Sequence, residues 1–251
     1  RMRPEDEPLA QRLAVWHARY NDEQSLLNTM GQLITVRQDI DSSSFRPYYS
    51  YDSRDNPFEP VRGTRFNFGV EYAGGILGGN NDFWRPTITY STFIPVANYP
   101  VRSLFAMNIE GGLLRQIGDR GLPFNELYRL GGDNSIRGHA FGSIFARGPN
   151  GGPLTDGNGF TLGGDRYIQA NLEYQFLLGG PFRLLVFADA GNVYGVDQKF
   201  DLSTIRSTAG LELRVLLPVF GAPLRFIYAF NLDEKPDDRF QRFQFSVGTA
   251  F

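Results

Sequence analysis

Apolar and polar residues alternate along most of the chain, from about residue 45 to its end. In the segment 168–178 every second residue is apolar or aromatic, and four of the five residues between them are polar: Gln169, Asn171, Glu173 and Gln175. A period of two is typical of a β-strand with two different faces. The same pattern predicts nine strands, at about 47–52, 66–72, 84–96, 104–116, 168–178, 183–193, 205–217, 224–230 and 243–251.

The residues on the two faces distinguish a membrane barrel from a soluble protein. The apolar faces are large and aromatic, and the chain has 22 Phe and 12 Tyr, whereas the polar faces carry Glu, Arg, Asn and Gln. An apolar outside and a polar inside are typical of an outer-membrane barrel, and strands of about 10 residues can cross the bilayer when tilted. We therefore predict an all-β, antiparallel transmembrane β-barrel in the outer membrane of a Gram-negative bacterium. A soluble β-sandwich is the alternative.

The connections between the predicted strands alternate in length. NYPV and PVFGAP are short, whereas GVDQKFDLST and above all the segment 117–165 are long. Outer-membrane barrels have short periplasmic turns and longer extracellular loops. We therefore expect 117–165 to be an extracellular loop and 54–63 to be a periplasmic turn.

The first 44 residues are less regular than the segment 45–251, which contains all nine strands. Residues 14–20 and 26–40 predict two further barrel strands, although the apolar residues of the second also fit one face of a helix. The total is then ten or eleven, and bacterial single-chain barrels use an even number.

Composition excludes several other functions. The net charge is −2, so there is no basic surface for nucleic acid, and there is no cysteine. The two histidines, His17 and His139, lie far apart in the sequence, and neither a GxxxxGK phosphate loop nor a GxSxG nucleophile motif occurs. We therefore expect no enzyme activity, no metal site and no cofactor.

One arginine is bracketed by glycines in the stretch LGGDNSIRGHAFG, at 130–142, inside the long loop. This stretch resembles the signature of the BamA superfamily of outer-membrane assembly and translocation barrels, also called the bacterial surface antigen family. The matching residues are Gly131, Gly132, Ile136, Arg137 and Gly138. His139 stands where the family pattern has an aromatic residue.

Four other segments resemble the same family in the same order. They are the turn DSRDNPFEPVRG, a strand that carries Glu173, the strand LLVFADAGNVYG with Phe187, Asp189 and Gly191, and the ending QRFQFSVGTAF. One such motif is weak evidence of kinship, but five in family order are specific. The resemblance covers about 45–251.

The resemblance implies that the long loop folds back into the barrel lumen. Arg137 would then meet Glu173, Phe187 and Asp189, with Gly191 on the same strand. An arginine held away from water needs a carboxylate, and its planar fork suits bidentate pairing and stacking on an aromatic ring. An ordinary solvated arginine in an exposed loop is the alternative.

The resemblance also assigns a role to the last strand, as an assembly signal and as one side of a weak seam. Its residues in this chain are Phe243, Phe245, Gly248 and Phe251. An interior glycine weakens strand pairing, which is compatible with a seam that opens. The simpler reading is that the three aromatic residues face lipid.

The function that the resemblance implies is assistance with the folding and insertion of other outer-membrane β-barrels. The alternatives are a pore that secretes a passenger protein and a membrane anchor for an N-terminal enzyme domain. The expected partners are membrane lipids and client proteins or a passenger. The resemblance implies sixteen strands, so this chain corresponds to the C-terminal part of the barrel, without periplasmic repeat domains. It is either a piece of a longer chain or a short member that closes alone or as a homo-oligomer.

Overall fold

The structure is a computed structural model built almost entirely of β-strands. Among the residues that the structure describes, three short 3-10 helices lie in the connections: η2 (Gly75–Leu77), η3 (Phe124–Glu126) and η4 (Leu202–Thr204). No helix in the described part of the chain is long and apolar enough to cross a membrane. The structure describes residues 25–27, 33–35, 41–79, 81–118, 124–148, 151–155, 161–196, 198–216, 222–235 and 238–250.

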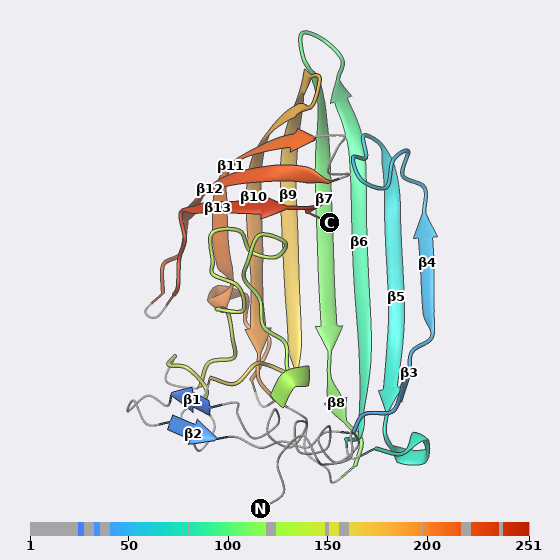
Figure 1. Cartoon of the computed structure of the whole chain (residues 1–251), viewed down its shortest axis with the longest axis vertical. Coiled ribbons are helices and arrows are strands. Elements are labelled where there is room, and N and C mark those ends of the chain that lie inside the picture. The colour runs from blue at the N-terminus through green and yellow to red at the C-terminus, as the bar shows by residue number, and fades with distance from the viewer. Residues whose placement is uncertain are drawn as a thin grey trace, which may run out of the picture.

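The main feature is an 11-stranded antiparallel sheet in which consecutive strands are neighbours (Figure 1). At one edge β3 and β4 both pair with β5, and within the sheet β7 and β8 both pair with β6. The prediction of an all-β, antiparallel fold is confirmed. The strands are β3 (Ser44–Phe45), β4 (Tyr48–Asp52), β5 (Gly63–Ala73), β6 (Phe83–Ala97), β7 (Arg102–Leu113), β8 (Arg115–Gln116), β9 (Arg166–Gly179), β10 (Phe182–Tyr194), β11 (Arg206–Leu216), β12 (Pro223–Asn231) and β13 (Phe243–Val247).

From residue 47 onward the observed strands follow the nine predicted ones, and two of the nine differ in extent. The strand predicted over 104–116 is interrupted at Leu114, between β7 and β8. The backbone N–H of Leu114 donates to the carbonyl of Asp165 at 2.5 Å, and Leu114 belongs to neither strand. The strand predicted over 243–251 ends earlier, at Val247, because Gly248 adopts a φ of +136°. Phe251 lies outside the described residues.

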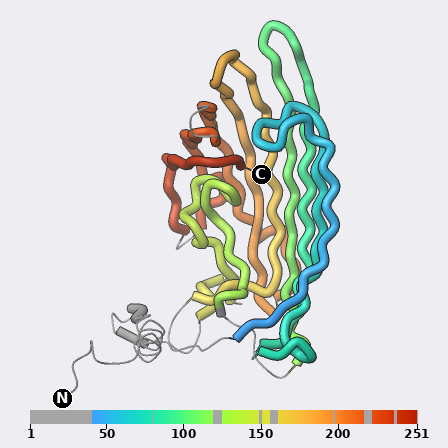
Figure 2. The backbone as a smooth tube through the Cα atoms, turned by 45° about the vertical axis from the view of Figure 1, so that its right-hand side comes forward, coloured from blue at the N-terminus to red at the C-terminus, as the bar shows by residue number. Residues whose placement is uncertain are grey.

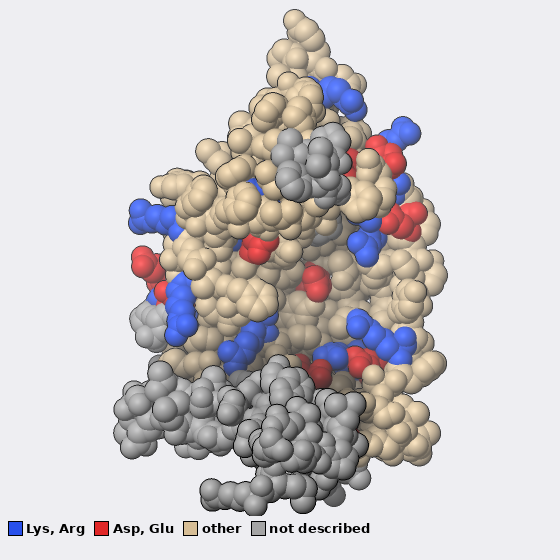
Figure 3. Space-filling model, viewed as in Figure 1, with Lys and Arg blue, Asp and Glu red and all other residues tan. Residues whose placement is uncertain are grey.

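The sheet has the polarity that the alternation predicts. On β9 the polar residues Gln169, Asn171 and Glu173 are buried, whereas Leu172 on the opposite face is 40 % exposed. The long loop lies over the concave face of the sheet (Figure 2). This is the polar face, because Ser135 of the loop forms hydrogen bonds with Gln169 and Asn171. In Figure 3 the charged side chains on this side of the molecule lie below the tip that the β6–β7 turn forms. An apolar convex face suits contact with lipid, so a soluble sandwich is not the architecture.

The sheet does not close on itself within the described residues, since β13 and β3–β4 are its two edges. In the range of the strand predicted over 26–40, the structure describes two short strands, β1 (Ser25–Leu27) and β2 (Leu33–Thr35), which pair with each other; the rest of that range lies outside the described residues. This hairpin forms a sheet of its own and adds no strand to the main one. The other predicted strand, at 14–20, lies outside the described residues.

Candidate functional site

The long loop between β8 and β9 folds back over the concave face of the sheet (Figures 1 and 2). Its entry is held by an ion pair between Glu126 and Arg85 of β6 at 2.6 Å, and Arg85 also pairs with Glu71 of β5 at 2.6 Å. Two isolated bridges, Tyr128 with Gly164 and Leu130 with Ile144, fold the loop on itself. These contacts carry the segment 131–140 over β9, β10 and β11.

Arg137, in this segment, is 1 % exposed and contacts three carboxylates. Its Nε and Nη2 donate to the two oxygens of Asp189 at 2.8 and 2.7 Å, which is a bidentate pair. Its Nη1 donates to Glu173 and to Glu212, each at 2.7 Å. The structure therefore brings Arg137 together with both carboxylates that the resemblance implies, and it adds Glu212.

Two further arginines complete a buried group of charges. Arg214 donates to Glu173 and to Glu212, each at 2.6 Å, and Arg225 donates to Glu212 at 2.7 Å. Three positive and three negative buried side chains therefore lie together, which matters because an unpaired buried charge is costly. The partly exposed Asp133 of the loop adds a longer ion pair with Arg225 at 3.6 Å, at the edge of this group. We call this group the charge cluster: Arg137, Arg214, Arg225, Glu173, Asp189 and Glu212.

Sequence reasoning missed three members of the charge cluster: Glu212, Arg214 and Arg225. The available signal was their position on the polar faces of the strands predicted at 205–217 and 224–230. That signal does not give the register, and the register decides which inward residues become neighbours. In the structure Phe187 pairs with Glu173 on one side and with Gly210 on the other, and Glu212 is the next inward residue on β11.

Aromatic and aliphatic packing surrounds the charges. The guanidinium carbon of Arg137 lies 3.8 Å from the centre of the Phe187 ring, within the range of a cation–π contact. Ile136 is fully buried, and a side chain at Gly191 would lie 2.9 Å from its Cδ1 and 2.8 Å from the carbonyl oxygen of Ile168. Gly191 therefore allows the loop to approach β10 closely.

The residues after Arg137 contact the C-terminal edge of the sheet. The Gly138 N–H donates to Oε1 of Gln244 at 2.8 Å, and Nε2 of Gln244 donates to the carbonyl of His139 at 3.0 Å. Gly138 has a φ of +89°, and a Cβ there would lie 2.6 Å from the Phe240 ring, so a larger residue does not fit. One glutamine side chain thus ties the loop to β13. Gly131 and Gly132, where the segment begins, also have positive φ, +104° and +108°.

His139 replaces the aromatic residue of the family pattern and occupies an aromatic environment. It is fully buried, and its ring lies edge-on to Phe240, with 5.5 Å between the ring centres. Neither ring nitrogen has a hydrogen-bond partner among the residues that the structure describes. Burial lowers the pKa of His139 below its usual 6.5, so the neutral ring acts as an aromatic side chain.

The last strand presents its aromatic residues to the outside. Phe243 and Phe245 are exposed on the convex face, whereas Gln244 and Ser246 face the loop. Gly248 follows the strand and keeps one backbone hydrogen bond, to the carbonyl of Pro223 at 2.9 Å. The aromatic residues are thus placed for lipid contact, and the polar ones hold the loop.

The site is built to hold a loop in place. Within the described ranges, no group of three or more His, Asp or Glu side chains is arranged to bind a metal ion. The carboxylates of the charge cluster are all taken up by arginines. Such a balanced, hydrogen-bonded group stabilises one arrangement of the loop and strands.

Comparisons with known proteins give the same picture. A curated relative, the outer membrane protein assembly factor BamA of Nitratidesulfovibrio vulgaris, is 32 % identical over 208 residues, which are 81 % of this chain and 25 % of the relative. The BamA of Neisseria meningitidis serogroup B is 28 % identical over 229 residues, 78 % of this chain and 27 % of its own. The chain thus spans about a quarter of the length of these relatives.

A eukaryotic relative and a solved structure extend the comparison. The sorting and assembly machinery component 50 homolog of Mus musculus is 31 % identical over 151 residues, 57 % of this chain and 29 % of the relative. The crystal structure of BamA from Haemophilus ducreyi lacking POTRA domains 1-3 has the same fold, with a TM-score of 0.70 and 24 % identity over 91 % of this chain and 46 % of that chain.

The bacterial relatives confirm the predicted outer-membrane location in a Gram-negative bacterium. Residues 3–251 match the Omp85 superfamily domain. The alternating sheet, the inserted loop with its arginine and this match agree, and the chain belongs to the Omp85 superfamily.

Proposed function

We propose that this chain is the barrel part of an outer-membrane assembly factor, which assists the folding and insertion of other β-barrel proteins. The proposal rests on kinship with relatives that are named as assembly factors. The observation that carries it is the C-terminal edge: β13 has five residues and pairs with β12, and it has no second strand partner among the described residues.

Such an edge suits strand exchange with a client. An unpaired strand offers N–H and C=O groups along its length, and an extended segment of another chain can add to it. No covalent chemistry is needed for this work. The exposed side chains Phe243, Phe245 and Val247 would meet lipid beside the incoming strand.

The opposite edge of the sheet, at β4, also needs a partner strand. All five residues of β4, Tyr48–Asp52, are exposed. Open sheet edges are not stable in the bilayer, so we propose that β4 pairs with a strand beyond the described sheet, from a longer parent chain or from a second copy in a homo-oligomer. Native mass spectrometry in lipid distinguishes these two, because only the second gives a particle of twice the mass.

The test is site-specific photo-cross-linking in lipid vesicles to a small outer-membrane barrel as the client. A photo-reactive residue replaces Phe245 on the edge strand, and the matched control replaces Val186 in the middle of the sheet. Both side chains are apolar and face outward, with exposed fractions of 56 % and 48 %. We expect a client adduct at position 245, little at 186, and faster client folding than in vesicles that hold an unrelated barrel.

Other outcomes contradict the proposal. Equal adducts at both positions, or no gain in client folding rate, exclude strand exchange at this edge. Adducts confined to the concave face, with Asn171 as the probe position, support a secretion pore instead.

A further inference from the structure

The turn between β4 and β5, at 54–63, is a compact structure that is tied to its own ends. The Asp55 carboxylate accepts hydrogen bonds from the N–H groups of Val61 and Arg62 at 2.9 and 3.2 Å. Arg54 pairs with both oxygens of Asp52, with the shortest contact at 2.8 Å. The turn therefore holds its shape and can act as one body.

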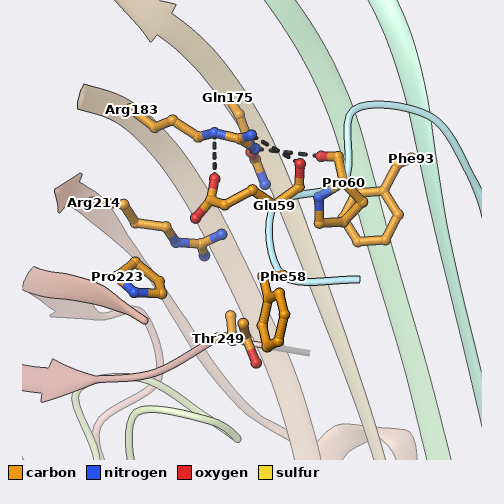
Figure 4. A pocket seen from close by; sticks show the side chains of 10 residues that line it. Phe58, Glu59, Pro60, Phe93, Gln175, Arg183, Arg214, Pro223 and Thr249 are labelled. Atoms are coloured by element: carbon orange, nitrogen blue, oxygen red, sulfur yellow. Dashed lines mark hydrogen bonds and ion pairs between the residues drawn. The ribbon is translucent and has the colours of Figure 1, made fainter. Parts of the chain in front are cut away.

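This turn reaches across the sheet to a strand far from its own. Arg183 lies near the start of β10, and β6, β7 and β9 separate β10 from β5. Its Nε pairs with the Glu59 carboxylate at 2.6 Å, and its two Nη atoms donate to the carbonyls of Glu59 and Pro60 at 3.1 and 3.3 Å (Figure 4). One arginine thus binds the turn by both side chain and backbone.

The same arginine is connected to the charge cluster. Arg183 donates to Oε1 of Gln175 at 3.1 Å, and Nε2 of Gln175 donates to Glu173 at 2.6 Å. Glu173 is itself bound to Arg137. A chain of hydrogen bonds therefore runs from the turn to the inserted loop along the concave face.

The turn also lies beside the C-terminal end of the sheet. Phe58 of the turn and Thr249, which follows β13, line one small cavity together with Arg214 and Pro223 (Figure 4). Glu59 is 8 % exposed, and Gln175 beneath it is 1 % exposed. The turn thus covers the end of the concave face at which the chain finishes.

We propose that the 54–63 turn is a latched cap over this end of the concave face, with Arg183 as its positioning residue. Release of the cap uncovers the end of β13 and so gives a client strand access to that edge. The role of the cap in client access rests on the proposed function, whereas the existence of the cap does not. The contacts on three groups of the turn by one partly buried arginine are the geometry that carries the proposal.

The first experiment measures whether Arg183 holds the turn. Trypsin cleaves after Arg54 and Arg62, both within the turn, and fragments are identified by mass spectrometry on the full chain in lipid vesicles. We compare Arg183→Gln and Glu59→Gln with Arg102→Gln, which removes an exposed arginine at the start of β7. Cleavage of a transiently opened segment follows the population of the open form. We expect cleavage in the turn to rise about tenfold or more in Arg183→Gln, less in Glu59→Gln, and not in the control.

Unchanged cleavage in both Arg183→Gln and Glu59→Gln overturns the proposal that Arg183 holds the turn as a cap. Glu59→Gln keeps the test valid if Arg183→Gln fails to fold, because it removes one charge and leaves the arginine in place. Equal cleavage in the Arg102→Gln control would also contradict a specific role of Arg183.

The second experiment asks whether the cap limits access. The client adduct at position 245 is measured in wild type and in Glu59→Gln, and we expect it to rise severalfold in the variant, because a larger fraction of molecules is open. If the yield of client adduct is unchanged while tryptic cleavage of the turn rises, the cap does not limit client access, but the proposal that Arg183 holds the turn stands. No adduct in either protein, with cleavage raised, is a failure of the proposed function and not of the cap.

Discussion

The inserted loop contacts two parts of the sheet that differ in how they are held together. In the middle, β9 and β10 have 14 and 13 residues, each has a strand on both sides, and the loop contributes a buried arginine. At the C-terminal edge, β13 has five residues. There the loop contributes neutral backbone groups that bind Gln244, and the Asp133 carboxylate, which accepts a hydrogen bond from Ser246.

The difference concerns how each region responds to change. Removal of one buried charge leaves the others uncompensated, so a single change in the middle is expected to weaken all contacts of the charge cluster together. Removal of one neutral hydrogen bond costs far less and acts locally. The structure therefore combines a rigid centre with an edge that can loosen separately, which an edge that exchanges strands requires.

The largest effect is expected from Arg137→Ala. It leaves Glu173, Asp189 and Glu212 with too few positive partners, so the free energy of unfolding should fall by about 3–5 kcal/mol. Urea unfolding in lipid vesicles measures this, and proteolysis should show a loosened loop over strands that still form.

The matched control is Arg147→Ala in the same loop. Arg147 has an ion pair with Asp238 at 3.4 Å, and its loss should cost about 1 kcal/mol or less. Equal effects of the two substitutions would mean that the cluster does not set the stability of the middle.

An intermediate effect is expected from Gly191→Ala. The added Cβ would lie 2.8 Å from the Ile168 carbonyl oxygen and 2.9 Å from Ile136, so the loop must move away from β10. Overpacking of this kind costs about 1–3 kcal/mol. In Gly195→Ala the nearest atom is 3.5 Å from the new Cβ, and unfolding should be unchanged. A neutral Gly191→Ala would argue against close packing at this point.

A smaller and local effect is expected from Gln244→Ala. Two hydrogen bonds to the loop backbone are lost, at about 1 kcal/mol each. Hydrogen exchange should become faster in β13 and stay the same in β9 and β10. The exposed side chain of Gln241 serves as the control, since Gln241→Ala removes neither bond. Faster exchange throughout the sheet would show that edge and centre are one unit.

The smallest effect concerns a third region, the 54–63 turn. Partial burial raises the pKa of Asp55, but hydrogen bonds from the Val61 and Arg62 amides outweigh this and hold it below its usual 3.8. The ionised carboxylate therefore stabilises the turn above its usual pKa, and this is lost as the pH falls through the lowered value. Exchange of these two amides should become disproportionately faster in acid. Asp55→Asn should remove this pH dependence of amide exchange. If the pH dependence persists in the variant, Asp55 is not its cause.

Much of the fold was predictable from local pattern. Alternation with a period of two placed Glu173 on the inward face and kept Phe187 and Asp189 on one shared face, because side chains in a strand alternate by geometry. It also gave strand bounds within a few residues. It was least informative in the first 44 residues, where the described strands β1 and β2 have only three residues each, too few to show a period.

The site was predictable only in part. The motif around Arg137 pointed to two carboxylates, but Glu212 and Arg225 enter the cluster through the registers of β10 with β11 and of β11 with β12. Register depends on long-range pairing and turn geometry, which local pattern does not encode. The contact of Arg183 with the 54–63 turn was missed for the same reason.

The equal number of positive and negative members in the charge cluster has an evolutionary consequence. Every single substitution that adds or removes a charge there breaks the balance, so the cluster can change without loss only in compensating pairs. Related chains should therefore show correlated replacement at 137, 173, 189, 212, 214 and 225, with intermediates that are rare or short-lived. An arginine at 137 can be old without being the best possible residue, because each single substitution that removes its positive charge is closed.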